Sequence, residues 1–448
     1  MAPEPAELAR LAASYLERQV WFQSAIDATP AAPIELVSAR TLRPSRPGLA
    51  RLILGRGEQR FQVLVGWRPP PELSKVLRGR ESALLGPVGD GQSSALAYDA
   101  VADDDLLLEL LVHVTGGKES AARVRRVSSL VSHASLVYDE RLFMKCYRVL
   151  ESGARPEVEV VLRLDKVGFN ALLAPVAHWR DDGFDLALVR EFLPSALEGR
   201  LLALTSLRDL LAHAAGGEDG RARERDAPRD DGATVPDADA ECASAGGDLA
   251  SEMRRLGATT ARLHLALATA FGDRPASASS FAEAHSALDE AGGNVAPELA
   301  ARLGTIDPAA AGRTIRLHGD YHLRRVMRSE VGWLVAGFSD DPLYAAVDAD
   351  GSLPGRRGSP VEDLADMCFS IRQIAREALS QRPGAEAADA TRLASAWERR
   401  NQAAFLEGYV TTHGVRRLLP REPSATELLL AAFEIARELR YEATSAEA

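Results

Sequence analysis

The stretch Arg316-Leu317-His318-Gly319-Asp320-Tyr321-His322-Leu323 decides the fold of this chain of 448 residues. Its pattern predicts a buried strand that ends in a loop with one carboxylate between two histidines. A carboxylate presented in this way can accept the proton of a substrate hydroxyl, so Asp320 is the candidate catalytic base. His318 is expected to brace the loop through hydrogen bonds to the backbone, and His322 to support it.

The two histidines admit other interpretations. They could be ordinary loop residues whose hydrogen bonds are satisfied nearby. They could also be a zinc pair, but a zinc site needs further His or Cys ligands, and the sequence offers none at a plausible spacing. The interpretation that uses Asp320 as a base therefore accounts for more of the pattern.

A second candidate site lies in the first half of the chain. Lys145 stands between Met144 and Cys146 in an apolar strand, where an ammonium group is costly unless it meets an anion. Glu159 falls in the first turns of a helix that begins at Pro156, and it is the expected ion-pair partner. Phosphoryl transfer uses such a pair, because the lysine holds the nucleotide phosphates. The plain alternative is a lysine at a strand edge and a solvated glutamate.

The composition, with 46% hydrophobic and 26% charged residues, is that of a soluble globular protein, and the length predicts two or three domains. No apolar run approaches the roughly 18 residues of a membrane span, and the acidic start has no basic signal segment. Three cysteines give no disulfide framework, which indicates a reducing cytoplasm. The net charge of −11 argues against a nucleic-acid partner.

The hydrophobic pattern divides the chain into three parts. Residues 1–118 predict a small α+β unit, and residues 119–200 predict strands around one helix. Residues 201–448 predict a set of helices that carries the stretch quoted first. Within them, residues 215–248 have almost no large apolar side chain, which predicts a disordered insertion.

Further motifs occur in an order that matches a known family. They are Glu140 to Lys145 followed by Pro156 to Glu159, then Arg190 to Pro194, Leu256 to Ala268, Ser359 to Met367, Ala404 to Tyr409 and Leu428 to Glu442. Together with residues 316–323, they resemble the maltokinase-like branch of the aminoglycoside-phosphotransferase and protein-kinase-like superfamily. The first hundred residues resemble the N-terminal cap of maltokinases, so the resemblance covers nearly the whole chain.

This resemblance implies an α+β, protein-kinase-like bilobal fold, with an antiparallel N-lobe sheet plus a helix, a helical C-lobe and an N-terminal α+β cap subdomain. It also implies ATP as cofactor and transfer of its γ-phosphate to a sugar hydroxyl, of maltose or an aminosugar. Glu191 and Leu193 would then lie in the hinge that meets adenine. Ser132 and Ser135 would belong to the loop that covers the phosphates, and Asp363 would support the catalytic loop.

Both positions at which the family holds magnesium have lost their donor atoms. The family has Gln or Asn where this chain has Arg325, and arginine has no lone pair to give to a cation. The family has Asp where this chain has Gly337. Asp340 and Asp341 follow, but Asp340 lies three residues on, roughly 10 Å further in an extended segment. The sequence therefore predicts that magnesium binding is impaired.

Arg324 and Arg325 allow a different way of neutralising a triphosphate. Two guanidinium groups can take up phosphate charge in place of a metal, which would make nucleotide binding independent of magnesium. The alternative is that both side chains point into solvent and have no part in binding.

Two functional hypotheses remain open at this point. The first is a pseudokinase that binds a sugar, or a partner enzyme of glycogen or trehalose metabolism, without turnover. The second is an active ATP-dependent sugar kinase with an atypical metal site. Neutralisation of charge is the largest demand of this reaction, and the loss of both metal positions favours the first.

Overall fold

The computed structural model describes residues 2–25, 32–89, 95–128, 133–224, 240, 242–243, 248–277, 285, 288–289, 295–307, 310–338, 357–380 and 387–447. The chain forms two compact units. The first holds Met1–Leu162 and Leu173–Pro194, and the second holds Arg163–Leu172 and Ser195–Ala448.

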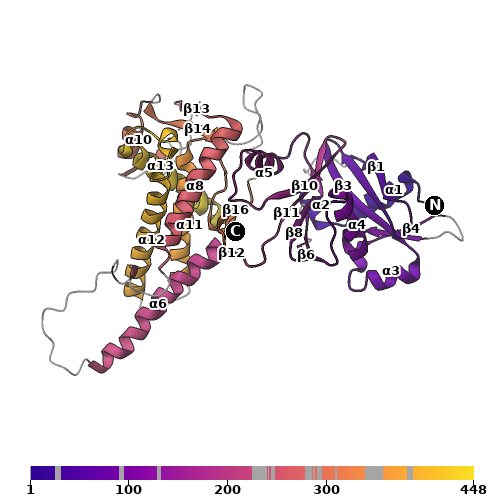
Figure 1. The fold of residues 1–448 in the computed structure, drawn as a ribbon, viewed down its shortest axis with the longest axis horizontal. Helices are drawn as coiled ribbons and strands as arrows, with labels where there is room; N and C mark the ends of the chain where they lie inside the picture. The colour runs from indigo at the N-terminus through magenta and orange to yellow at the C-terminus, as the bar shows by residue number, and fades with distance from the viewer. Residues whose placement is uncertain are drawn as a thin grey trace. The chain divides into compact units, whose positions relative to one another are not determined.

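The first unit begins with an antiparallel sheet in the order β1-β2-β3-β5-β4 (Figure 1). The strands are β1 Glu35–Arg43, β2 Gly48–Arg56, β3 Gln59–Arg68, β4 Leu84–Val88 and β5 Ala95–Asp99, and the helices are α1 Pro5–Leu16, α2 Val20–Ala25, α3 Pro70–Val76 and α4 Asp104–Val114. The apolar side of α1 and of α2 packs on the sheet, with Leu16, Phe22 and Phe61 fully buried. The expected α+β unit in this region is confirmed.

A second antiparallel sheet of the first unit has the order β10-β11-β8-β7-β6. Its strands are β6 Val124–Ser128, β7 His133–Tyr138, β8 Leu142–Tyr147, β10 Pro175–Asp181 and β11 Phe184–Glu191, and α5 Pro156–Lys166 follows β8 after the short β9 Val149–Leu150. The turn between β7 and β8 has Asp139 and Glu140 at positive φ. The carboxylate of Asp185 on β11 accepts the Arg155 backbone N–H at 2.6 Å, which fixes the start of α5.

The two sheets are joined by buried polar groups, so they form one unit. The Arg51 guanidinium on β2 is almost fully buried and donates to Asp182 Oδ2 at 2.9 Å and to Asp181 on the β10–β11 turn. Gln62 on β3 donates to the carbonyl oxygen of Tyr147 at 2.7 Å. The boundary expected between residues 118 and 119 therefore falls inside a unit held together across it, and a cap separate from an N-lobe stays a prediction.

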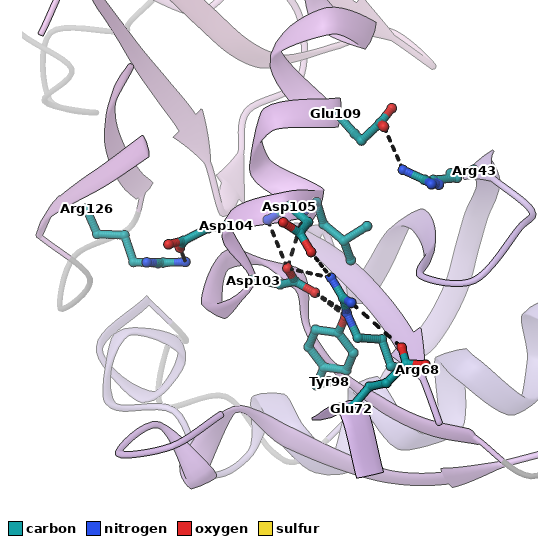
Figure 2. Close-up of polar contacts among 10 residues, drawn as sticks. Arg43, Arg68, Glu72, Tyr98, Asp103, Asp104, Asp105, Glu109 and Arg126 are labelled. Atoms are coloured by element: carbon teal, nitrogen blue, oxygen red, sulfur yellow. Dashed lines mark hydrogen bonds and ion pairs between the residues drawn. The ribbon is translucent and has the colours of Figure 1, made fainter. Parts of the chain in front are cut away.

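A buried arginine organises the far end of the first sheet (Figure 2). Arg68 at the end of β3 donates to Asp103 Oδ2 at 2.7 Å and to the exposed Asp105 at 2.6 Å, and its Nε also contacts Tyr98. Asp103 is also the N-cap of α4, because its Oδ1 accepts the Asp105 backbone N–H at 3.0 Å. One buried carboxylate thus fixes both the arginine and the start of the helix.

The second unit is mainly helical. Its helices are α6 Gly199–Glu224, α8 Ala250–Phe271, α10 Val295–Leu303, α11 Pro360–Ser380, α12 Ala387–Val410 and α13 Pro423–Glu447. Helix α12 packs along α8 and α11, and α13 packs on α11, as the bundle of ribbons in Figure 1 shows. Short strands carry the loops of interest: β14 Arg313–Arg316, β15 Val326–Ser329, β16 Gly332–Val335 and β17 Arg357–Gly358. The expected α+β class is confirmed.

The predicted insertion at 215–248 overlaps one described element. Helix α6 continues to Glu224, and residues 225–239 lie outside the described residues. In the described part of the chain, none of the helices combines the length and the apolar character that crossing a membrane requires. The three cysteines are buried thiols.

We predict that Asp103→Ala destabilises the first unit by about 3 kcal/mol or more, because it leaves the buried Arg68 charge without its main partner and removes the cap of α4. Hydrogen exchange of the α4 amides together with urea unfolding measures the effect. Asp105→Ala is the matched control: its side chain is 70% exposed, so its loss costs less than about 1 kcal/mol. Equal losses for the two variants would contradict this account of the network.

Candidate functional site

Lys145 in the first unit meets a carboxylate, as an ammonium in an apolar strand requires. It lies on β8 with its side chain 12% exposed, and its Nζ contacts Glu157 Oε2, whose side chain is only 2% exposed. Tyr147 donates its hydroxyl to the same oxygen at 3.3 Å, and Arg190 Nη2 lies 3.5 Å from Glu157 Oε1. Glu157 is therefore the carboxylate that the structure places against the lysine.

The structure pairs Lys145 with Glu157, whereas the sequence named Glu159, and the role expected for Glu159 stays a prediction. Both glutamates lie in the first turn of the helix, with Glu157 directly after Pro156. Asp185 fixes the backbone just before the helix by accepting the Arg155 N–H. The sequence carried one usable signal for Glu157: an acid next to an N-terminal proline sits where a helix start favours negative charge.

The strand next to Lys145 supplies the neighbouring polar groups. Ser135 on β7 is buried and is the register partner of Lys145, while Ser132 lies outside the described residues. His133 follows at the start of β7. Burial and the positive charge of Lys145 lower the pKa of His133 from 6.5 to about 4, so the imidazole is neutral at physiological pH.

The predicted hinge residues lie at the end of β11. The Glu191 backbone N–H donates to the carbonyl oxygen of Ala174 at 3.0 Å, and its side chain is exposed. The backbone N–H of Phe192 donates to the carbonyl oxygen of Arg141 at 2.8 Å, and Leu193 is half-buried. Their assignment to adenine stays a prediction.

In the second unit, one buried carboxylate binds the backbone of the loop 316–323. Asp363, in the first turn of α11, accepts the backbone N–H of His318 at 2.9 Å and that of Gly319 at 3.1 Å. Burial alone would raise the pKa of Asp363, but the contacts with His264 and His318 outweigh it, and the pKa lies below its usual range. The carboxylate is thus charged and fixes the loop backbone.

The helix start that presents Asp363 is capped by its own sequence. The Ser359 hydroxyl accepts the Val361 backbone N–H at 3.3 Å, and the Glu362 carboxylate accepts the Ser359 backbone N–H at 2.9 Å. This reciprocal arrangement is a capping box. A further supporting residue, His264 on α8, was missed in the sequence: its Nε2 lies 3.2 Å from Asp363 Oδ2 and its Nδ1 2.8 Å from the Tyr409 hydroxyl.

His318 is buried, and its two ring nitrogens contact backbone groups of the site. Its Nδ1 accepts the Asp320 backbone N–H at 3.4 Å, and its Nε2 lies 3.2 Å from the carbonyl oxygen of Ala336. The ring also packs against Phe338, with the ring centroids 4.7 Å apart. Burial lowers the pKa of His318 from 6.5 to about 4, which fits one accepting and one donating ring nitrogen.

The candidate base, Asp320, is already engaged by two basic side chains. Arg325 directs Nε to Asp320 Oδ2 at 3.0 Å and contacts the same oxygen with Nη2, and His322 Nε2 lies 3.3 Å from Oδ1. Burial acts to raise the pKa of Asp320, but the hydrogen bonds from His322 and Arg325 hold it well below its usual range. A carboxylate held in this way is a weak proton acceptor.

The Arg325 side chain lies against Gly337. The Ala336 backbone N–H donates to the Arg325 carbonyl oxygen at 2.8 Å, which brings the two segments together. Gly337 has φ +68°, and a Cβ built on it would lie 2.7 Å from Arg325 Nη1. The guanidinium therefore fills the space that any side chain at position 337 would enter. Arg325 and Gly337 therefore lie directly beside each other.

These residues do not fit a magnesium ion. Magnesium takes oxygen donors, and the side chains that contact the Asp320 carboxylate are a guanidinium and an imidazole. Within the ranges that the structure describes, no three or more His, Cys, Asp or Glu side chains gather as a metal site. Asp340 and Asp341 lie outside those ranges, so a role for either as a ligand stays a prediction.

A cavity of about 770 Å³ opens beside Asp320 in the second unit. It is lined by Arg200, Asp320, Tyr321, His322, Arg324, Asp366, Phe369, Ser370, Gln373, Ile374, Arg376, Glu377, Ser380, Arg437, Arg440 and Tyr441. Its size is that of a small-molecule site. The loop residues that form one wall bring the candidate base to the cavity.

Comparison with known proteins identifies the fold of the chain. Over 98% of this chain and 94% of the other, the fold matches a solved glucosamine kinase in complex with glucosamine, ADP and inorganic phosphate, with a TM-score of 0.58 at 20% identity. A second structure of a glucosamine kinase, crystal form A, matches with a TM-score of 0.59 at 20% identity over the same shares. The chain thus has a kinase-like fold.

Within that class the chain is similar to maltokinase-like proteins. Residues 15–103 match the maltokinase N-terminal cap domain. A glucosamine kinase from Streptacidiphilus jiangxiensis is 29% identical over 173 residues, which is 35% of this chain and 37% of that protein. The alignment therefore spans just over a third of that relative. The expected resemblance is confirmed, and the matches support a sugar-kinase-like protein.

The buried histidines predict acid lability. Because the folded pKa of His318 is about 4 instead of 6.5, the folded chain binds fewer protons than the unfolded chain between these values, and stability rises with pH across that window. We expect His318→Asn to reduce the rise of Tm with pH between 4 and 6.5. Part of the rise remains, because His133 also has a lowered pKa. His413→Asn, at an exposed position, is the control, and an unchanged slope in His318→Asn would refute the assignment.

Proposed function

We propose that this chain is a sugar-kinase-like protein whose catalysis is impaired or lost, and which acts as a pseudokinase that binds a sugar and a nucleotide. The observation that carries the proposal is the contact of Arg325 with Asp320 across Gly337. A guanidinium takes the place of the metal, and it neutralises the carboxylate that would accept the hydroxyl proton. Impaired transfer follows from both effects.

Nucleotide binding is proposed to persist without a divalent cation. Lys145 and Glu157 form the pair that orients a lysine toward phosphates, and the solved glucosamine kinase of the same fold is described with ADP. Arginine suits phosphate through its planar, fully charged group. ATP would therefore be held by charge and backbone contacts, with Ser135 and the hinge residues Glu191 and Leu193 as further members of the site.

An active ATP-dependent kinase for glucosamine, maltose or a related sugar is the second candidate. It is favoured by the retained Lys145 pair, by Asp320 beside a cavity and by the similarity to glucosamine kinases. In that case Asp340 or Asp341 would have to supply a metal ligand. A binding role toward a partner enzyme of glycogen or trehalose metabolism, in the cytoplasm, is the remaining form of the pseudokinase proposal.

Thermal-shift measurements test the first proposal. We expect ATP in the presence of EDTA to raise Tm as much as ATP with added Mg²⁺, because no side chain of the described site binds the ion, and a ligand that binds only the folded state stabilises it. Glu157→Gln, which removes the charge that orients Lys145, is expected to reduce the shift. Stabilisation that requires Mg²⁺, or phosphate transfer to glucosamine or maltose that requires it, would establish the active kinase instead.

The contact between positions 325 and 337 predicts non-additive variants. Gly337→Asp alone is expected to lower stability, because its Cβ meets the Arg325 guanidinium. Arg325→Gln/Gly337→Asp is expected to recover much of that loss, with an interaction energy of about 1 kcal/mol or more. The double variant is also expected to gain an ATP-induced shift that depends on Mg²⁺, since both oxygen donors are then present. Additive losses in a double-mutant cycle would show that the two positions are independent.

A further inference from the structure

The cavity beside Asp320 has an excess of positive charge. Among its lining residues, five arginines stand against three carboxylates. Among the described residues, Arg325 pairs with Asp320 and Glu438 pairs with Arg376. These two partners carry opposite charges and cancel each other. A cleft lined by one sign of charge concentrates ligands of the opposite sign.

Each of the three carboxylates already has its own guanidinium. Asp320 is held by Arg325, as described above. Asp366 receives both Nε and Nη2 of Arg437, and Arg200 Nη2 lies 2.5 and 2.7 Å from the two oxygens of Glu377. An incoming ammonium group would have to displace an arginine to reach any of them. The cavity is therefore poorly suited to a cationic aminosugar.

Arg324 differs from Arg200, Arg325 and Arg437 because its guanidinium pairs with no carboxylate of the described residues. It is exposed, it lines the cavity next to His322, and it forms no ion pair within the described part of the chain. Its position on the short turn Leu323–Arg325 is fixed, since its backbone N–H donates to His322 Nδ1 at 3.2 Å. A planar guanidinium at the rim of a cavity is a suitable partner for a phosphate or a carboxylate.

Two aromatic residues among the lining offer a surface for an apolar ring face. Phe369 and Tyr441 line the cavity and pack edge to face, with their centroids 5.8 Å apart. The cavity therefore combines an aromatic wall for a ring with a cation for an anion attached to that ring.

We propose that this cavity selects an anionic sugar, one that carries a phosphate or a carboxylate, over a neutral sugar or an aminosugar. The inference rests on the proposed function only in taking the cavity as the sugar site. The shared chemistry is a polyhydroxylated ring with one anionic group, which Arg324 meets.

Calorimetry on the full chain without nucleotide tests the proposal, with glucose 6-phosphate, glucuronate, glucose and glucosamine as probes. We expect at least one of the two anionic probes to bind about tenfold more tightly than glucose, with glucosamine the weakest, and to lose affinity as salt is raised. The comparison of phosphate with carboxylate identifies the anion. Tighter binding of glucose or glucosamine, or no binding of either anionic probe at millimolar concentration, would overturn the proposal.

Two variants act in opposite directions, so a folding defect cannot imitate both. Arg324→Gln is expected to weaken the anionic probe about tenfold and to leave glucose unchanged, whereas Arg10→Gln, the same charge change at an exposed position on α1, has no effect. Glu377→Gln releases Arg200 and is expected to tighten the anionic probe. Equal effects of Arg324→Gln and Arg10→Gln would count against the inference.

Measurements of ATP binding and of phosphate transfer separate this inference from the proposed function. If Arg324→Gln weakens ATP binding but not the binding of any sugar, the positive wall serves the nucleotide and the inference fails. If the chain transfers phosphate with Mg²⁺ yet prefers anionic sugars, the pseudokinase proposal fails and the inference stands.

Discussion

The arrangement of the second unit depends on the charged carboxylate of Asp363. A buried charge is costly unless it is fully paired, and here two backbone N–H groups of the loop and the ring of His264 provide the partners. The same bonds that satisfy the charge fix the positions of His318 and Gly319. The direction in which Asp320 faces is therefore set by a residue more than forty positions later in the sequence.

A fixed loop makes the substitution at position 325 decisive. The Arg325 backbone N–H donates to the His322 carbonyl oxygen at 2.8 Å. This bond fixes the backbone of Arg325 close to the loop, where its side chain contacts Asp320. The glycine at 337 then gives the guanidinium room. A positive charge that is part of the chain differs from a bound ion, because it neither exchanges with solvent nor moves with the phosphates during transfer.

Much of the fold was predictable because local signals agreed with the tertiary structure. The apolar strand that carries Lys145 and the helix that begins at Pro156 each appear where the sequence indicated. The capping box at Ser359 and Glu362 can also be found from spacing alone, although it was not singled out.

The site was harder to predict because its contacts depend on side-chain direction and on distant partners. The contact of Lys145 with Glu157 depends on how α5 is rotated about its axis, which the sequence alone does not give. His264 looks like an ordinary helix residue until Tyr409 and Asp363 are brought beside it. The contact between Arg325 and Gly337 could not be predicted from either residue alone. Only the structure shows that the Arg325 guanidinium occupies the space beside Gly337.

The buried arginine on β2 also limits how such chains can recombine. Arg51 reaches out of the N-terminal sheet to a turn that is encoded some 130 residues later. Replacing the N-terminal sheet alone, or the two acids alone, would leave a buried guanidinium or its carboxylates without these partners. The stability of the first unit therefore depends on two segments that are distant in the sequence.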